Sequence, residues 1–469
     1  MEAFDSAGLW WLPDDPTEQV VGLLRFSAAD GFRLSIPFGN LGGLKNMAAR
    51  VNHPEPASLV HGVLRNGKHV TLTNVLMTNM TMSMPGASTE EYYSNAGLVG
   101  VEQPAANPEV ERIKLRYTHL RDWVGNHPCS STHSFEGDRW GRSVDYHYET
   151  PEPEELASGD GWTLAILHFA TVPTASVTGF NLTHDCELEL RFDNPLSLEA
   201  AMARFVNPVW QFLVFCLDRD VDTLSLRIKP EATDDWVDVG HHQFVCGTDG
   251  KILTEPFMML SRRQLGDRSA AVLSTWMSLS EDERRAVSLL TGLVGERTGS
   301  SDLRFLVAAQ GLEALSRVDA REFELEPIEF ERRASAVLES VADAKLQKWL
   351  KRKLRSYLNE RSANELLRDL MDDIGPYVEK LAPSRRSLLA DIRSNRNFYT
   401  HRDARRASRV LDGEQLYILT QAVILLLKAA ILRRVGFTRE EALSIMEENQ
   451  GALQWRIKTA RQYSADVLA

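Results

Sequence analysis

The residues with the clearest chemical potential lie in the stretch SNRNFYTH, residues 394–401, near the end of a long helical segment. Arg396 carries a planar cation that can hold a phosphate through paired hydrogen bonds. His401 follows after four intervening residues, and histidine exchanges a proton near neutral pH. Asn397 lies one helical turn before His401 and could orient the imidazole or the phosphate. The stretch is therefore either a nuclease site or the hydrated face of a surface helix.

Spacing alone does not separate these two interpretations. With 41 arginines and 12 histidines in 469 residues, chance gives about three pairs separated by four to six residues. The chain contains the pairs Arg396/His401, Arg142/His147, Arg121/His127 and Arg112/His119. Only the first pair lies in a helical segment. Its surroundings must therefore decide between a nuclease site and a hydrated helix face.

On a helical wheel, Arg396, Asn397, Thr400 and His401 form a polar arc beside an apolar stripe. Arg396 and His401 point about 140° apart and lie about 7.5 Å apart along the helix axis. Their long side chains could converge on one phosphate, especially in a groove shared by two subunits. A hydrated polar face is the alternative, because such faces are common on amphipathic helices.

Charge is locally basic here, although the chain has a formal net charge of −12. Residues 384–409 hold eight arginines and two aspartates, which favours contacts with RNA phosphates over plain helix solubility. The flanking arginines expected to position RNA are Arg393, Arg402, Arg405 and Arg406. Residues 345–355 hold six basic residues and no acidic one, but their side chains could simply cover apolar neighbours.

The elements that position these residues fall into two halves with different hydrophobic periods. Up to about residue 250, short alternating stretches predict a β-rich domain with an embedded helix, so the whole chain is assigned to the α+β class. The helix is expected over residues 197–220, with a kink at Pro208. Strands are expected over residues 20–27, 32–38, 68–77, 112–120, 162–169, 186–192 and 222–229.

From about residue 270 a period of 3.6 residues predicts an all-α bundle. Helices are expected over residues 281–296, 301–318, 327–342, 344–359, 362–374, 384–402, 413–434 and 438–448. The most apolar run, residues 416–432, is interrupted by Gln421 and Lys428 and is short for a bilayer span. We therefore expect a buried helix and no membrane partner.

Cysteine usage and the N-terminal residues indicate a cytoplasmic protein. The four cysteines are widely spread and form no CxxC pair, which fits a reducing compartment without disulfides. Residues 1–16 have no basic start and no continuous apolar core, so no signal peptide is expected.

Two other chemical patterns fail in context. GVLRNGK, residues 62–68, has the spacing of a phosphate-binding loop, but His69 replaces the required hydroxyl residue and no helix follows. An Asn-Gly hairpin turn is expected there instead. A zinc site would need the fold to gather residues that lack the usual spacing, so no metal or cofactor is expected. Its candidate ligands would be His127, Cys129, His133, His184 and Cys186.

The helical half with RNFYTH resembles the HEPN superfamily, whose active members carry arginine, a polar residue and then histidine at this spacing. LRFLVAAQGLEAL, residues 303–315, resembles the early helix of the ApeA-like branch, including Leu312 and Glu313. Residues 8–37, GLWWLPDDPTEQVVGLLRFSAADGFRLSIP, resemble the start of the ApeA N-terminal domain. The resemblance therefore touches both halves in the expected order.

This resemblance implies a metal-independent endoribonuclease, a toxin of bacterial anti-phage defence by abortive infection, working as a HEPN dimer. The 2′-hydroxyl of RNA would attack the phosphate, with His401 as general acid or base. Arg396 and Asn397 would complete the catalytic group, and Glu313 and Thr400 are candidate supporting residues.

The expected domains are a β-rich ApeA-like N-terminal domain (1–250), a connecting segment (251–280), a HEPN-like helical domain (281–450) and a C-terminal tail (451–469). In this interpretation the first domain detects a phage-derived trigger or restrains the nuclease. The alternative is a non-catalytic helical dimerisation or scaffold protein, whose β-rich domain binds a ligand or a protein.

Overall fold

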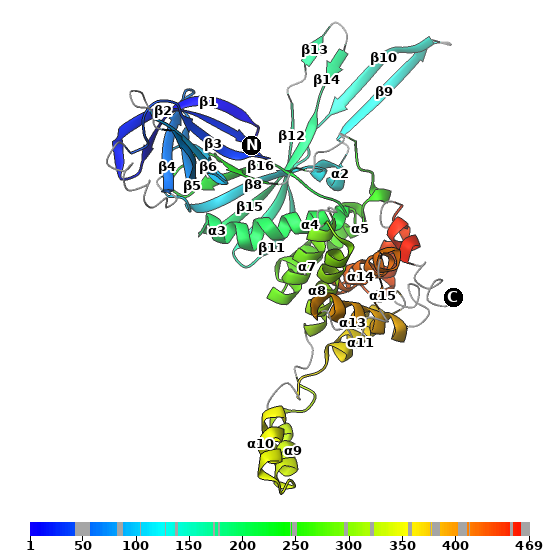
Figure 1. Cartoon of the computed structure of the whole chain (residues 1–469). Coiled ribbons are helices and arrows are strands. Elements are labelled where there is room, and N and C mark those ends of the chain that lie inside the picture. The colour runs from blue at the N-terminus through cyan, green and yellow to red at the C-terminus, as the bar shows by residue number, and fades with distance from the viewer. Residues whose placement is uncertain are drawn as a thin grey trace. The chain divides into compact units, whose positions relative to one another are not determined.

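A computed structural model gives the fold of the chain (Figure 1). It describes residues 1–469 except 43–56, 82–87, 104, 127, 137–138, 172–173, 177–178, 244, 246–250, 295–298, 319–322, 355–358, 376, 378–384, 402–409, 412, 451–453 and 461–469. The chain divides into two compact units, which are described separately. The β-rich unit comprises Met1–Leu213, Asp220–Glu255 and Leu260–Met277, and the helical unit comprises Val214–Arg219, Pro256–Met259 and Ser278–Ala469.

One large antiparallel sheet dominates the β-rich unit, and two separate hairpins accompany it. The sheet contains β1 (Phe4–Leu12), β2 (Asp15–Ser27), β3 (Gly31–Ile36), β4 (Ala57–Leu64), β5 (His69–Thr81), β6 (Thr89–Ser94), β7 (Ala96–Gly100), β8 (Glu109–Tyr117), β11 (Glu154–Gly159), β12 (Trp162–Ala170), β15 (His184–Ser197), β16 (Thr223–Pro230) and β17 (Val237–His241). The hairpins are β9 (Cys129–Glu136) with β10 (Arg139–Tyr148), and β13 (Thr174–Ser176) with β14 (Gly179–Asn181).

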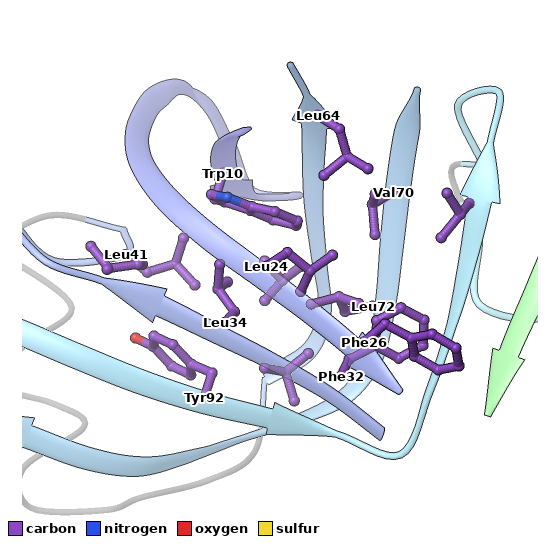
Figure 2. Close-up of a cluster of buried hydrophobic side chains, with 14 residues drawn as sticks. Trp10, Leu24, Phe26, Phe32, Leu34, Leu41, Leu64, Val70, Leu72 and Tyr92 are labelled. Atoms are coloured by element: carbon purple, nitrogen blue, oxygen red, sulfur yellow. The ribbon is translucent and has the colours of Figure 1, made fainter. Parts of the chain in front are cut away.

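The first six strands close into a barrel, in the order β5-β4-β1-β2-β3-β6, because β6 pairs back onto β5. Alternation along β3 places Phe32 and Leu34 inside and Arg33 outside. Trp10 is fully buried among the apolar side chains of this core (Figure 2). Gly62 makes room for it, since a Cβ at that position would lie 2.3 Å from Cε3 of Trp10.

The sheet continues from β5 through β7, β17, β16, β8, β15 and β12 to β11. A continuous helical segment follows β15, formed by α3 (Leu198–Ala201), the π-helical turn η1 (Met202–Val206) and α4 (Asn207–Leu217). Phe205 packs against Trp162 and Phe192, with ring centroids 5.9 and 5.0 Å away. The predicted embedded helix is thus confirmed, with a π-helical turn that ends two residues before Pro208, which has no N–H to donate.

All seven strands predicted by alternation overlap observed strands. The predicted hairpin at residues 62–68 is also confirmed, because β4 and β5 pair antiparallel and Gly67 adopts a φ of 83° in their turn. The remaining short elements are α2 (Leu120–Val124), η2 (Glu255–Phe257), α5 (Arg262–Leu265), η3 (Gly266–Arg268) and α6 (Ser269–Met277). The expected connecting segment, residues 251–280, therefore contains helices.

The helical unit contains all eight predicted helices. They are α7 (Glu281–Val294), α8 (Ser301–Arg317), α9 (Pro327–Glu339), α10 (Ala344–Leu354), α11 (Ala363–Ile374), α13 (Arg385–His401), α14 (Gly413–Arg434) and α15 (Arg439–Glu448). Capping side chains fix several of their starts. The Ser362 hydroxyl accepts a hydrogen bond from the Glu365 amide, and Thr438 accepts one from Glu441 in the same way.

Helix α14 forms the centre of the helical unit and packs against α7, α8, α11 and α15. Helix α14 and the segment Leu198–Leu217 are apolar and long enough to cross a bilayer by length and composition alone. The most apolar part of α14 is 89% buried inside the fold, as expected for a core helix. Gly311 of α8 allows a close approach to this helix, since a Cβ there would lie 2.8 Å from Cδ2 of Leu427.

Candidate active site on helix α13

Helix α13 carries the arginine and histidine at its C-terminal end and packs against α8 and α11. Leu388, Leu389 and Ile392 are buried, which fixes the rotation of the helix about its axis. That rotation turns Arg393, Thr400 and His401 outward, where all three are exposed, and leaves Arg396 and Asn397 half-buried.

Arg396 is held by a glutamate from the neighbouring helix α8. Its Nε lies 2.9 Å from Oε1 of Glu313, and its Nη2 donates to Oε2 at 3.0 Å. This two-point pairing fixes the plane of the guanidinium more tightly than a single contact would. The structure therefore brings together Arg396 and Glu313, which lie 83 residues apart in the sequence.

Asn397 completes the immediate surroundings of this cation, because its Oδ1 accepts a hydrogen bond from Nη1 of Arg396 at 3.3 Å. A guanidinium has five N–H donors, and these contacts use three of them. The other two donors have no partner among the described residues and can bind a phosphate. Glu313 offsets the charge of Arg396 without using its whole capacity to bind an anion.

His401 is the last residue of α13 and is exposed. Within the part of the chain that the structure describes, no hydrogen bond or ion pair joins His401 or Thr400 to the group around Arg396. The five-residue step along the helix corresponds to about 7.5 Å, so a phosphodiester could lie between the two side chains. The imidazole is open to such a reactant.

Two residues that the sequence analysis did not single out hold the chain beyond the helix end. Asn395 is fully buried, its Nδ2 donates to the carbonyl of Asp391 at 2.8 Å, and its Oδ1 accepts from the amide of Leu411 at 2.8 Å. Tyr399 donates its hydroxyl to the carbonyl of Leu411 at 2.7 Å. The signal that could have found them is their place on the apolar side of the helical wheel, where a polar group needs a specific partner.

Only one of the four arginines expected to bind RNA lies within the described residues. Arg393 is exposed on α13, eight residues before His401. Arg402, Arg405 and Arg406 lie outside the described residues.

The other arginine–histidine pairs lie in different surroundings. His119 is engaged locally, with its Nδ1 2.8 Å from Oδ2 of Asp122. His147 is exposed on the hairpin strand β10. His127 lies outside the described residues.

The candidate zinc ligands are not gathered in the described part of the chain, which contains no group of three or more His, Cys, Asp or Glu side chains arranged to hold a metal ion. Cys129 and His133 lie on β9, whereas His184 and Cys186 lie on β15. Burial raises the pKa of the Cys186 thiol to about 12, which favours the uncharged thiol over a metal-binding thiolate.

The β-rich unit contains a second candidate site, a pocket of about 1320 Å³. Glu187 is almost fully buried on its wall and pairs with two cations, Lys114 at 2.8 Å and Arg227 at 2.7 Å. Both cations lie over the ring of Trp236, at 5.0 and 5.9 Å from its centroid. The carboxylate of Glu187 therefore lies between two cations, and further charged side chains of both signs line the pocket.

Two further groups of this pocket carry unused hydrogen-bonding capacity. Nδ1 of His168 and Nε of Arg116 are buried and have no partner among the described residues. Burial lowers the pKa of His168, with an opposing effect from Glu154, so its neutral form is favoured near pH 7. Buried polar groups usually have partners, so these atoms suggest a bound molecule or water at this place.

Comparison with protein families gives two matches that cover most of the chain. Residues 5–276 match the model described as ApeA N-terminal domain 1, and residues 306–441 match the model described as Apea-like HEPN. The second match contains Glu313 and the whole of α13. No curated protein and no solved structure matched the chain.

Proposed function

The chain belongs to the ApeA-like HEPN anti-phage proteins, and from this premise we propose that it is a metal-independent endoribonuclease with Arg396, Asn397 and His401 in its active site. The Apea-like HEPN match supports a nuclease-type role in anti-phage defence. The observation that carries the proposed mechanism is the oriented guanidinium of Arg396 on the same helix as His401, which is exposed and has no hydrogen bond or ion pair with a described residue.

The proposed reaction uses a nucleophile that RNA itself supplies. The 2′-oxygen attacks the adjacent phosphorus, and the bond from phosphorus to the 5′-oxygen breaks. His401 accepts the proton of the 2′-hydroxyl or donates one to the leaving 5′-oxygen. In a HEPN dimer, one histidine from each subunit could divide these two roles. The products carry a 2′,3′-cyclic phosphate and a 5′-hydroxyl.

Arg396 stabilises the charge that builds up on the phosphate during this step. Its two remaining N–H donors can bind two phosphate oxygens while Glu313 and Asn397 keep the guanidinium plane fixed. A donor that is already oriented needs no rearrangement when charge develops, which is the condition for electrostatic catalysis.

The test is RNA cleavage by the purified full chain with and without a chelator. We expect wild-type cleavage to survive chelation, and His401→Ala or Arg396→Ala to reduce it by about 100-fold or more. The matched control is His147→Ala, because His147 follows Arg142 at the same spacing but lies on the exposed strand β10. Cleavage that survives His401→Ala, or that strictly needs a divalent metal, contradicts the proposal.

One observation favours the alternative of a non-catalytic helical scaffold. The pairing of Arg396 with Glu313 is also what a purely structural ion pair between α8 and α13 would provide. A scaffold would lose thermal stability on Arg396→Ala but would be unaffected in every assay by His401→Ala, since His401 is exposed. Toxicity or phage protection in bacteria that requires both residues excludes the scaffold.

We also propose that the β-rich unit senses infection and controls the nuclease. Its family match covers residues 5–276, and its pocket is lined by Lys114 and Arg227 and by buried polar atoms of Arg116 and His168 that have no partner among the described residues. A phage-derived molecule that binds there would supply the trigger.

A further inference from the structure

The segment between α8 and α11 forms a helical hairpin, here called the arm (residues 323–354 with 359–360). Its base is closed by Asn359, whose side chain accepts from the amide of Leu325 at 2.9 Å and donates to its carbonyl at 2.8 Å. A bridge between Phe323 and Glu360 pairs the two ends of the arm. The arm is therefore a discrete element, and Figure 1 shows its helices α9 and α10 lying side by side.

Hydrophobic burial does not explain why the chain retains these helices. Ala334 is the one buried residue in the described parts of α9 and α10. Ile328 is 88% exposed, and Leu346 and Trp349 are each 48% exposed. Isolated helices of this length are only marginally stable in water. Because the arm has so little hydrophobic core, we infer that it is retained for the side chains on its surface.

The arm presents a basic face. Lys345, Lys348, Lys351 and Arg352 are exposed on α10, which has no acidic residue, and they fall within about 120° of its wheel. None of them forms an ion pair with a described residue. The structure describes no buried apolar residue on α10 for their stems to cover.

The three glutamates of α9 form no ion pair with α10 among the described residues. Glu329 is engaged by its own helix, at 2.7 Å from Nη2 of Arg332 and 2.6 Å from Nε of Arg333. Like charges three and four residues apart repel one another and weaken the helix that carries them. A polyanion laid along α10 would convert this repulsion into attraction.

The side chains beside the basic face favour RNA over a lipid surface. Leu350 and Leu354 lie opposite the basic face and are partly covered, whereas Lys345, Lys348, Lys351 and Arg352 are exposed. Two apolar side chains of α10, Leu346 and Trp349, are half exposed, which is less than the continuous apolar face of a membrane helix. A membrane-binding helix instead needs a free apolar face to insert. Trp349 borders the basic face and is half exposed, where its ring can stack on an unpaired base.

We propose that the arm is an RNA-binding element, in which α10 binds phosphates of single-stranded RNA and Trp349 stacks on a base. This inference rests on the proposed function, because it takes RNA as the substrate. Since the net charge of the chain is −12, RNA contacts must be local, and the arm offers such a place.

The test measures binding of a fluorescent 20-nucleotide single-stranded RNA to the full chain carrying His401→Ala, so that cleavage does not interfere. Replacing Lys345, Lys348, Lys351 and Arg352 by Gln is expected to weaken binding at least tenfold. The slope of log K against log[salt] should fall by up to about 3, since each lost phosphate contact removes about 0.7. Trp349→Ala should weaken binding about tenfold without changing that slope.

The matched control is Arg332→Gln with Arg333→Gln, because these arm arginines already pair with Glu329 and should leave RNA binding unchanged. Circular dichroism checks that each variant keeps its helices. In the catalytically competent chain, the four-residue variant should raise KM and leave kcat unchanged.

Unchanged RNA binding by the four-residue variant overturns the arm proposal, whether or not the wild type cleaves RNA. Loss of binding to phosphatidylserine vesicles instead of RNA overturns it in favour of a membrane role. RNA binding that depends on the arm, in a chain that never cleaves RNA, supports the arm and refutes the nuclease.

Discussion

At the residue scale, the position of Glu313 beside Arg396 is compatible with two opposite effects on phosphate binding. It orients the guanidinium of Arg396, and it also places a negative charge where a phosphate would bind. We favour the orienting role, because two N–H donors of Arg396 have no partner among the described residues while Glu313 is bound.

We therefore predict that Glu313→Gln lowers kcat for RNA cleavage about tenfold while KM changes little, because a misplaced guanidinium binds the transition state less well. Steady-state cleavage of a short RNA measures both constants. The control is Asp369→Asn, which removes another ion pair of this unit, between Asp369 on α11 and Arg361 at 2.6 Å. Faster cleavage by Glu313→Gln would show that Glu313 competes with the phosphate instead.

Part of the candidate site could be predicted from the sequence. The positions of Arg396, Asn397 and His401 on one helix follow from the 3.6-residue period. The contact of Glu313 with Arg396 is observed, and the supporting role of Glu313 stays a prediction. Asn395 and Tyr399 were missed because their partner, the backbone of Leu411, becomes available only when the chain turns back after α13. The period of apolar residues describes the faces of one helix. It does not predict that the backbone of Leu411 lies beside that helix.

At the scale of elements, helices were easier to predict than strands for a physical reason. A helix forms its backbone hydrogen bonds within itself, so the sequence pattern that predicts it is local. Strand β9, with the sequence CSSTHSFE, shows no alternation of apolar and polar residues, so its sequence does not predict a strand. Closure of the barrel depends on β5 pairing with β6 as well as with β4. Such pairing geometry is absent from the residues of any single strand.

Helix α14 also shows how a charged residue is tolerated in the core of the helical unit. Lys428 is fully buried and pairs with Asp218, which adopts a positive φ of 50° just after α4. We predict that Lys428→Met lowers the free energy of unfolding by about 3 kcal/mol, because it leaves Asp218 charged and unpaired in the interior. Denaturant unfolding of the full chain measures this loss.

The control is the double variant Lys428→Met with Asp218→Asn, which removes both charges and keeps a residue that accepts a positive φ. It should recover most of the stability lost in the single variant. Equal destabilisation of the two variants would mean that the volume of the lysine matters and its charge does not.

The same pair predicts how stability depends on pH. Burial lowers the pKa of Lys428 to about 8 from its ordinary value of 10.5, against the opposing effect of Asp218. Between these two values the unfolded chain binds more protons than the folded chain, so this group makes the free energy of unfolding rise with pH. Denaturant unfolding at pH 8 to 10 should show the rise in the wild type, and a smaller one in the double variant.

At the scale of the whole molecule, the proposed trigger pocket and the proposed active site lie in different compact units. We predict that Arg227→Ala abolishes protection against phage but leaves RNA cleavage by the purified protein unchanged, because Arg227 lines the pocket and lies in the unit without the candidate active site. Phage plating on bacteria that express each variant measures protection.

Arg191→Ala provides the comparison, since Arg191 pairs with a glutamate of the same sheet but does not line the pocket. It should preserve both protection and cleavage. If Arg227→Ala protects as well as the wild type, the pocket does not receive the trigger.

The closed base of the arm has a consequence for how this protein can change over evolutionary time. Because Phe323 and Glu360 pair directly, the chain enters and leaves the arm at nearly the same point. A gene could therefore acquire, lose or exchange the intervening segment in one event, with a short turn closing the gap. Descendants could then alter which RNA molecules they capture while the bundle that holds α13 is inherited intact.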